Sequence, residues 1–347
     1  MRLTLLVPEL VWPEPADKQT LDRLTCPGLE WLLARGTLER GTPLNFEAAL
    51  AQRFGLTTDA PFGPLRLLGE TVTAFGPDAR RGTWLCADPV HLRFHHERIV
   101  LADAGAFELT DDEAHALAIA LNREFAEMGE FHVAASRRWY LRLHQEEMHA
   151  AAPLSAVAGR RMDGELPADG GASPLRRWLN EVQMFLHGHP VNEARLAAGQ
   201  PPVNSLWLWG AGSLPETLAP PFTSVWSAAP LALGLARAAR LPARDLPADL
   251  AALQASGDAG GAPLVVLDGL QAPVLYEDGE AWRTTLAALD HDWFAPARAG
   301  LGRGVDTLTL VAPTIYGLLA WEIRAADRWK VWRRPRPLAE LATELAA

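Results

Sequence analysis

The residues whose side chains are best suited to bind a ligand lie in one stretch of the sequence, HGHPVNEARLAAGQPPVNSLWLWGAGS, from His187 to Ser213. Imidazole nitrogens such as those of His187 and His189 are common metal ligands, and an arginine fork binds phosphate or carboxylate in a bidentate manner. Backbone N–H groups in a glycine-rich turn can also bind an anion. The stretch therefore indicates a site for a metal ion or for an anion such as phosphate.

The candidate pocket and anion-binding residues share a polar or flexible character and lie in this stretch or at the end of a predicted strand. They are His187, His189, Asn192, Arg195, Asn204, Gly210, Gly212, Ser213 and Asp268. The weaker candidates for metal ligands are Glu9, Asp268, His187 and His189. We assign no residue as catalytic from the sequence.

Each of these residue types also has a structural alternative. His187 and His189 lie where a helix ends, a place that favours cationic or hydrogen-bonding side chains. Asn192 and Arg195 could instead form a polar network that fixes a turn onto a sheet, and Asn204 precedes a buried strand, which favours a structural role. The glycine turn that begins at Gly210 is a weak signal, because a lone Gly-x-Gly is common.

Buried strands alternating with helices would position these residues. Apolar runs predict strands over 3–7, 204–209, 264–267 and 306–311, and amphipathic or apolar segments predict helices over 29–36, 45–54, 175–186, 225–241 and 281–289. This order predicts an α/β fold, a mostly parallel or mixed central sheet flanked by helices. Ligand sites in such sheets lie beyond the carboxyl ends of the strands, where Gly210 and Asp268 follow.

A different pattern begins at Trp84. Apolar and polar residues alternate over 90–94, a second short strand covers 98–103, and a third covers 139–143. Between them, Thr110 and Glu113 form a capping box that predicts the start of a helix. The pattern predicts a small inserted α+β domain over residues 81–150, within a core made of residues 1–80 and 151–347.

Composition limits the class of partner and the compartment. The 347 residues carry a net charge of -10, which argues against a nucleic-acid binder. Cys26 and Cys86 are the only cysteines and lie far apart, as is typical of a reducing compartment. The apolar run at the N-terminus is too short for a signal peptide or a membrane span. We therefore expect a cytoplasmic protein that does not bind membranes or nucleic acid.

The C-terminal region is locally basic, in contrast to the whole chain. Tryptophans are interleaved with its cationic residues, which are Arg324, Arg328, Lys330, Arg333, Arg334 and Arg336. This region could form a surface for a partner. The interpretation favoured by the sequence is a solvated edge strand followed by the start of a helix.

Three segments carry a resemblance to a known family. They are HPVN with PVNSLWLWGAG (189–192 and 202–212), the 98–125 segment RIVLADAGAFELTDDEAHALAIALNREF, and the strand before Asp268 together with the later TLTLV strand. With these segments the sequence resembles the alkaline-phosphatase superfamily, an alkaline-phosphatase-like fold. More specifically it resembles the archaeal-type cofactor-independent phosphoglycerate mutases and their divergent bacterial relatives, the RpfE-type regulatory proteins.

The resemblance implies a site with two divalent ions, held by Asp and His at strand ends, and a serine nucleophile. This sequence departs from that pattern. Glu9 stands after the first strand in place of an Asp-Gly pair, Ala312 and Pro313 stand where an Asp-His pair is expected, and Thr57-Thr58 is the nearest hydroxyl pair to the expected serine. Two carboxylates, those of Glu9 and Asp268, do not complete a site that needs about six N or O ligands.

The departures predict a catalytically degenerate protein, a pseudoenzyme with a regulatory or binding role on a phosphomutase scaffold. Its expected partner is an unknown protein or a small phosphorylated ligand, and we expect no cofactor. The alternative is an active metal-dependent phosphomutase or phosphohydrolase with an altered ligand set, which would use Mn, Mg or Zn.

Overall fold

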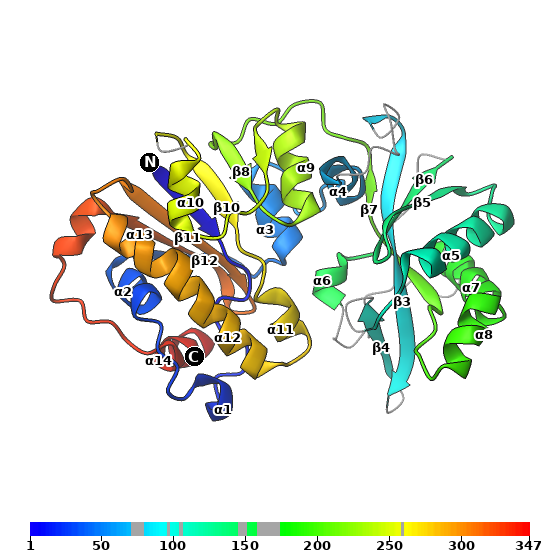
Figure 1. Cartoon of the computed structure of the whole chain (residues 1–347), viewed down its shortest axis with the longest axis horizontal. Helices are drawn as coiled ribbons and strands as arrows, with labels where there is room; N and C mark the ends of the chain where they lie inside the picture. The colour runs from blue at the N-terminus through cyan, green and yellow to red at the C-terminus, as the bar shows by residue number, and fades with distance from the viewer. Residues whose placement is uncertain (71–79, 96–97, 104–106, 145–150, 158–173, 258–259) are drawn as a thin grey trace. The chain divides into compact units, whose positions relative to one another are not determined.

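The computed structural model describes residues 1–70, 80–95, 98–103, 107–144, 151–157, 174–257 and 260–347 (Figure 1). The chain forms two compact units. The first unit combines Met1–Thr58 with Leu218–Ala347, and the second unit is the continuous segment Asp59–Thr217. Among the described residues, no helix is long and apolar enough to cross a bilayer.

A mixed sheet of seven strands forms the centre of the first unit. Its strands are β1 (Arg2–Leu6), β2 (Thr37–Arg40), β8 (Ser224–Trp226), β9 (Ala243–Arg244), β10 (Pro263–Val266), β11 (Thr307–Thr314) and β12 (Gly317–Arg324). They follow the order β2-β12-β11-β1-β10-β8-β9. β1 pairs in parallel with β10 and β11, and β10 with β8, whereas β12 and β2 are antiparallel additions at one edge.

Helices and short helical turns surround this sheet in the first unit. They are α1 (Lys18–Leu21), α2 (Pro27–Arg35), α3 (Phe46–Arg53), α9 (Pro230–Ala238), α10 (Leu250–Ala255), α11 (Gln271–Leu275), α12 (Gly279–Leu289), the π-helical turn η3 (Asp290–Phe294), α13 (Ala295–Gly300), the 3-10 turn η4 (Ala325–Trp329) and α14 (Leu338–Ala346). Leu5 and Leu310 of the sheet share a buried core with Leu29 of α2 and Leu286 of α12. Burial of such apolar side chains is the main stabilising contribution to this layer.

The second unit is built on an antiparallel sheet. Its elements are α4 (Phe62–Gly69), β3 (Thr83–His95), β4 (Arg98–Asp103), α5 (Asp111–Glu124), β5 (Gly129–Ala135), β6 (Arg138–Leu143), α6 (Leu154–Val157), α7 (Pro174–His187), α8 (Pro190–Ala197) and β7 (Ser205–Gly212). The long strand β3 pairs with β4, β6 and β7. Leu117 and Leu121 of α5, Leu179 of α7 and Leu206 of β7 lie in one buried cluster. The predicted capping box of Thr110 and Glu113 opens α5.

The α/β class with a central mixed sheet flanked by helices is confirmed, but two details of the sequence analysis differ from the structure. The expected core included residues 59–80 and 151–217, yet these belong to the second unit. The physical reason is strand pairing, because β7 pairs with β3 and α4 packs on both. The predicted helix over 225–241 is also shorter, since residues 224–226 form β8 and helix α9 starts at Pro230.

Candidate functional site

The carboxyl ends of the parallel strands meet at one edge of the first unit's sheet. The N–H of Glu9, after β1, donates to the carbonyl of Pro313 in β11 over 3.0 Å. The N–H of Leu267, after β10, donates to the carbonyl of Leu6 over 2.9 Å. These contacts place the residues after β1 beside the last residues of β11, and the residue after β10 beside the end of β1. An open α/β sheet places its ligands at this edge, which we call the carboxyl edge.

Asp268 directly follows β10 and Leu267 at the carboxyl edge. Its backbone carbonyl accepts a hydrogen bond from the N–H of Gln271 over 3.1 Å, which opens α11. Burial raises the pKa of the Asp268 carboxyl above its ordinary value. A carboxyl in such a place holds its proton to a higher pH than a solvated one. Asp268 and Glu9 are the two sequence candidates that the structure places at this edge.

Replacing Asp268 by asparagine is expected to raise the free energy of unfolding at neutral pH. The pKa of Asp268 is higher in the folded chain than in the unfolded chain, so ionisation destabilises the fold. That destabilisation is absent below about pH 4, the ordinary pKa of aspartate, and develops as the pH rises towards the raised folded value. Urea unfolding across this pH range measures the difference, which should vanish in acid.

The exposed Asp245 in the same unit provides the matched control. Asp245→Asn should leave the free energy of unfolding within about 0.5 kcal/mol of the parent at every pH. A stabilisation by Asp268→Asn that stays constant from acid to neutral pH would contradict the assignment to a buried carboxyl.

Glu9 adopts a backbone conformation that is rare for a residue with a side chain. Its φ is 57°, in the left-handed region. Such a conformation costs about 1 kcal/mol and persists only where the surroundings stabilise it. Here the carbonyl of Glu9 accepts a hydrogen bond from the indole Nε1 of Trp282 over 3.0 Å. The indole thus fixes the chain as it leaves β1.

Three buried aromatic residues close the carboxyl edge beside Glu9. The rings of Trp12 and Trp282 lie 5.5 Å apart, and the hydroxyl of Tyr316 donates to the carbonyl of Trp12 over 3.0 Å. Burial, reinforced by nearby Glu14 and Glu9, raises the pKa of Tyr316 to about 12. Sequence reasoning did not identify this aromatic closure. The available signal was the number of tryptophans, 13 in the chain, which does not say where they meet.

The donor set at the carboxyl edge does not fit a two-metal centre. The segments after β1 and β10 supply the carboxylates of Glu9 and Asp268. The last three residues of β11 are Ala312, Pro313 and Thr314, and none of them has a carboxylate or imidazole side chain. In the parts of the chain that the structure describes, no group of three or more His, Cys, Asp or Glu side chains is arranged to hold a metal ion. We therefore derive no chemical step through a metal here.

The stretch from His187 to Ser213 lies in the second unit, within Asp59–Thr217. Its strand, β7, pairs with β3 in an antiparallel sheet. The expectation that this strand ends at the carboxyl edge of the parallel sheet is therefore wrong. Apolar composition had indicated a buried strand, and β7 is buried over 205–209, but burial does not reveal the sheet to which a strand belongs.

Asn192 lies buried in α8, and its side-chain amide makes three hydrogen bonds with the backbone. Its Nδ2 donates to the carbonyls of Leu186 and Val203, each over 2.8 Å. Its Oδ1 accepts from the N–H of Val203 over 2.9 Å. The side chain thus links the end of α7 to the segment that enters β7. This is the structural role that was the alternative to anion binding.

Replacing Asn192 by alanine is expected to lower the free energy of unfolding by about 2–3 kcal/mol, because three hydrogen bonds are lost among buried groups. Urea denaturation followed by circular dichroism measures the loss. Leu196 is exposed on the same helix, and Leu196→Ala should change the value by less than about 0.5 kcal/mol. Equal stability of the parent and Asn192→Ala would favour a ligand-binding role for this residue.

Arg195 is also buried, and its guanidinium joins α8 to the start of α5. Its Nε donates to the carbonyl of Pro201 over 2.9 Å, and its Nη2 donates to the carbonyl of Glu108 over 2.7 Å. Its Nη1 lies 2.9 Å from Oε2 of Glu113, the same carboxylate that caps α5 through Thr110. The guanidinium of Arg195 is therefore occupied by partners within the protein and forms part of a structural network.

The remaining polar candidates of the stretch do not come together in one site. His187 is exposed in the last turn of α7, and His189 caps α8 by accepting the N–H of Val191 at Nδ1 over 3.2 Å. Asn204 pairs with the backbone of Leu92 through both side-chain atoms, over 2.7 and 2.8 Å. The side chain of Asn204 thus adds two hydrogen bonds between β3 and the residue that precedes β7.

The glycine turn contacts the chain rather than an open space. A Cβ on Gly210 would lie 2.7 Å from Cβ of Phe62, and a Cβ on Gly212 would lie 2.7 Å from Cβ of Pro61. Both glycines have positive φ, 66° and 148°. The hydroxyl of Ser213 donates to the carbonyl of Gly82 over 3.2 Å. The glycines therefore permit the close approach of α4 to β7.

Comparison with solved structures agrees with the class of fold. The solved structure of the PH0037 protein from Pyrococcus horikoshii matches 98% of this chain and 91% of that one, with a TM-score of 0.53 and 13% sequence identity. The mixed α/β fold, a central sheet flanked by helices, is therefore shared with a known protein. No protein-family model matches the chain.

Sequence relatives specify the group within this class. The chain is 28% identical over 216 residues to the 2,3-bisphosphoglycerate-independent phosphoglycerate mutase of Methanosarcina acetivorans, which covers 58% of this chain and 52% of that protein. It is 29% identical over 147 residues to the Methanosarcina barkeri protein of the same name, which covers 40% and 36%. The chain thus spans about half or less of the length of these relatives. The predicted relationship to the cofactor-independent phosphoglycerate mutases is confirmed, and the RpfE-type subgroup stays a prediction.

Proposed function

We propose that this protein is a non-catalytic relative of the phosphoglycerate mutases, which acts by binding a partner protein or a small phosphorylated ligand. The observation that carries the proposal is the aromatic closure of the carboxyl edge. Trp282 is fully buried there, and Trp12 and Tyr316 are nearly so. A phosphomutase needs a concave, polar site at this edge, and packed indole and phenol rings take that space.

The surroundings of Asp268 support the same proposal. Within the residues that the structure describes, Asp268 does not belong to a group of three or more His, Cys, Asp or Glu side chains that could hold a metal ion. The neighbouring strand end supplies Ala312, which is fully buried and has no side-chain donor. A regulatory role of the RpfE type is consistent with this lack of metal ligands. We propose that this role requires a partner protein or a small phosphorylated ligand.

Turnover assays with a matched variant test the proposal. The purified chain is assayed for conversion of 3-phosphoglycerate to 2-phosphoglycerate and for hydrolysis of p-nitrophenyl phosphate, with added Mn, Mg or Zn. The expected result is that the parent and Asp268→Ala show the same rate as the buffer blank. An active mutase provides the positive control for each assay.

Turnover by the parent that Asp268→Ala abolishes, with an unchanged circular dichroism spectrum, would overturn the proposal. That result would favour an active enzyme with an altered ligand set. Metal content of the purified protein provides a second readout, because about two ions per chain together with turnover would identify a rebuilt site.

A further inference from the structure

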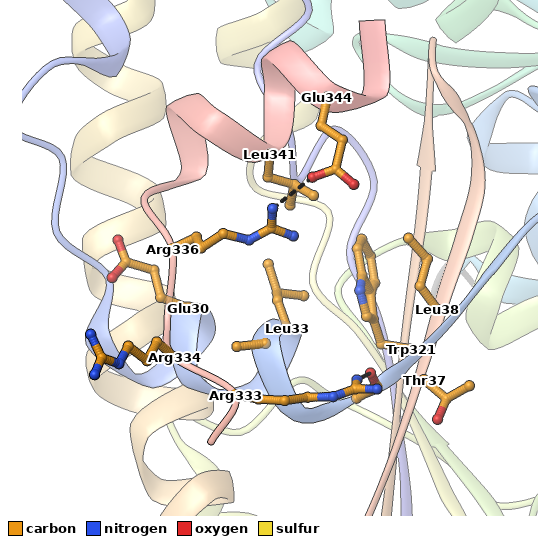
Figure 2. A pocket seen from close by; sticks show the side chains of 12 residues that line it. Glu30, Leu33, Thr37, Leu38, Trp321, Arg333, Arg334, Arg336, Leu341 and Glu344 are labelled. Atoms are coloured by element: carbon orange, nitrogen blue, oxygen red, sulfur yellow. Dashed lines mark hydrogen bonds and ion pairs between the residues drawn. The ribbon is translucent and has the colours of Figure 1, made fainter. Parts of the chain in front are cut away.

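A pocket of about 480 Å³ opens on the first unit among α2, the paired strands β2 and β12, and α14 (Figure 2). Its apolar side is formed by Leu33, Leu38, Trp321 and Leu341. Leu38 and Trp321 are direct partners in the β2–β12 register, so their side chains share one face of the sheet. The volume and the apolar lining suit a side chain or a small apolar group.

Three arginines from the segment between η4 and α14 stand around this pocket, and we call the whole the arginine pocket. Figure 2 shows Arg333 and Arg336 extending towards the strands and α14, whereas Arg334 points to the side of Glu30. Arg336 is paired with Glu344 over 2.9 Å, and Arg333 donates to the carbonyl of Gly36 over 3.3 Å. Within the described residues, Arg334 has no hydrogen-bond or ion-pair partner.

Large apolar side chains at the end of η4 and in the segment that follows it are exposed to solvent. The exposed fractions are 67% for Trp329, 72% for Val331 and 73% for Trp332. A single exposed apolar residue is ordinary, but three within four positions are a local concentration of exposed apolar side chains, as is typical of an interaction site. Tryptophan and arginine are also the residue types most enriched among those that dominate binding energy at protein interfaces.

We propose that the arginine pocket, together with Trp329, Val331 and Trp332, docks an acidic segment of a partner protein. One apolar side chain of that segment enters the pocket, and its carboxylates pair with the guanidinium groups of Arg333 and Arg334. Arginine recognises carboxylates in this bidentate way better than lysine does. The rest of the interface covers the exposed indole rings.

Charge and size favour this occupant over other anions. Nucleic acid or an anionic membrane extends beyond the locally basic segment and meets the rest of a chain whose net charge is -10, whereas a short acidic peptide contacts the basic segment alone. Glu30 and Glu344 also line the pocket, so an acidic segment must place its carboxylates near Arg333 and Arg334 and an uncharged apolar group beside the two glutamates. A small ligand that fills the pocket would leave Trp332 uncovered. A peptide with spaced carboxylates and apolar residues meets both requirements.

The inference does not depend on the proposed loss of catalysis. The lining residues come from α2, β2, β12, α14 and the segment before α14, and none follows β1, β10 or β11 at the carboxyl edge. An active enzyme and an inactive one could both use this surface. The turnover assays therefore test only the proposed loss of catalysis, and the binding experiment tests only the docking surface.

Selection from a library identifies the chemistry of the occupant. A phage-displayed library of random twelve-residue peptides is selected on the purified full-length chain and counter-selected on the double variant Arg334→Glu with Trp332→Ala. The expected peptides are rich in Asp and Glu and carry an apolar residue at a fixed position. Peptides without acidic enrichment, or equal recovery on the parent and the double variant, would overturn the proposal.

Single variants then measure the contribution of each contact to binding of the strongest selected peptide. Arg334→Glu and Trp332→Ala should each weaken binding by about tenfold or more in fluorescence anisotropy. Arg303 is an exposed arginine elsewhere in the first unit, and Arg303→Glu should change the affinity by less than about twofold. Both tested side chains are exposed, so unchanged thermal unfolding confirms that each variant is folded.

Two further probes separate the other anionic partners. Vesicles of phosphatidylserine and phosphatidylcholine, and a single-stranded oligothymidine, are tested at the same salt concentration as the peptide. We expect neither the vesicles nor the oligothymidine to bind. If either probe binds more tightly than the selected peptide and Arg334→Glu abolishes that binding, the surface recognises a membrane or a nucleic acid instead.

Discussion

Replacing Arg66 by methionine is expected to lower the free energy of unfolding of the second unit by about 3–5 kcal/mol. Arg66 lies on α4, and its guanidinium pairs with both oxygens of Asp88 in β3 over 2.7 and 2.8 Å. The side chain of Asp88 is only 1% exposed. Loss of the arginine leaves a buried carboxylate with its charge uncompensated. Urea unfolding monitored by tryptophan fluorescence measures the effect.

A network around this ion pair explains the size of the expected loss. Asp88 also accepts from Nε1 of Trp209 over 2.8 Å, and Nε of Arg66 donates to the hydroxyl of Tyr140 over 2.9 Å. That hydroxyl in turn donates to Glu70 over 2.6 Å. Burial raises the pKa of Tyr140 well above its ordinary value, so the phenol stays a donor. The network joins α4 to three strands.

Arg123 is the matched control, because it is an exposed arginine on α5 of the same unit. Arg123→Met should change the free energy of unfolding by less than about 0.5 kcal/mol. The double variant Arg66→Met with Asp88→Leu should recover part of the loss, since no buried charge is then left unpaired. A loss of less than about 1 kcal/mol for Arg66→Met alone would show that water reaches Asp88.

Replacing Trp282 by alanine is expected to destabilise the first unit by about 3–5 kcal/mol. The indole is fully buried, and its removal leaves a large cavity beside Trp12. It also removes the hydrogen bond that holds Glu9 in its left-handed conformation. Differential scanning calorimetry should show a lower melting temperature for the transition of this unit.

The variant Trp282→Phe distinguishes the contribution of the buried ring from that of the indole N–H group. Phenylalanine keeps much of the apolar volume but cannot donate to the carbonyl of Glu9, so a smaller loss of about 1–2 kcal/mol is expected. If both variants were as stable as the parent, the aromatic residues would not hold the carboxyl edge together. The main support for a non-catalytic protein would then be lost.

Local sequence signals predicted the elements of the fold well. The capping box of Thr110 and Glu113 opens α5 as expected, and the apolar runs at 3–7, 264–267 and 306–311 became β1, β10 and β11. Pairing over long distances was not predictable from such signals. The run at 204–209 is as apolar as the others, yet β7 pairs with β3 in the other unit.

The candidate site was predictable in part, because only some of its residues follow strands directly. Asp268 and Glu9 lie where the strand ends predicted them. Asn192 and Arg195 have the right chemistry for an anion, but the same groups satisfy backbone carbonyls, and only the distances to Val203 and Pro201 distinguish the two uses. The aromatic closure depends on residues from distant segments, so no local pattern indicates it.

The order of strands in the first unit has a consequence for synthesis on the ribosome. β1 lies between β10 and β11, and its Arg2 pairs in register with Thr307. At about 5–20 residues per second, roughly 15–60 s separate the translation of these partners. The second unit is continuous in sequence and is complete long before then. The apolar strand β1 therefore lacks β10 for most of this interval and β11 for all of it, and binding by a chaperone would protect β1 during that time.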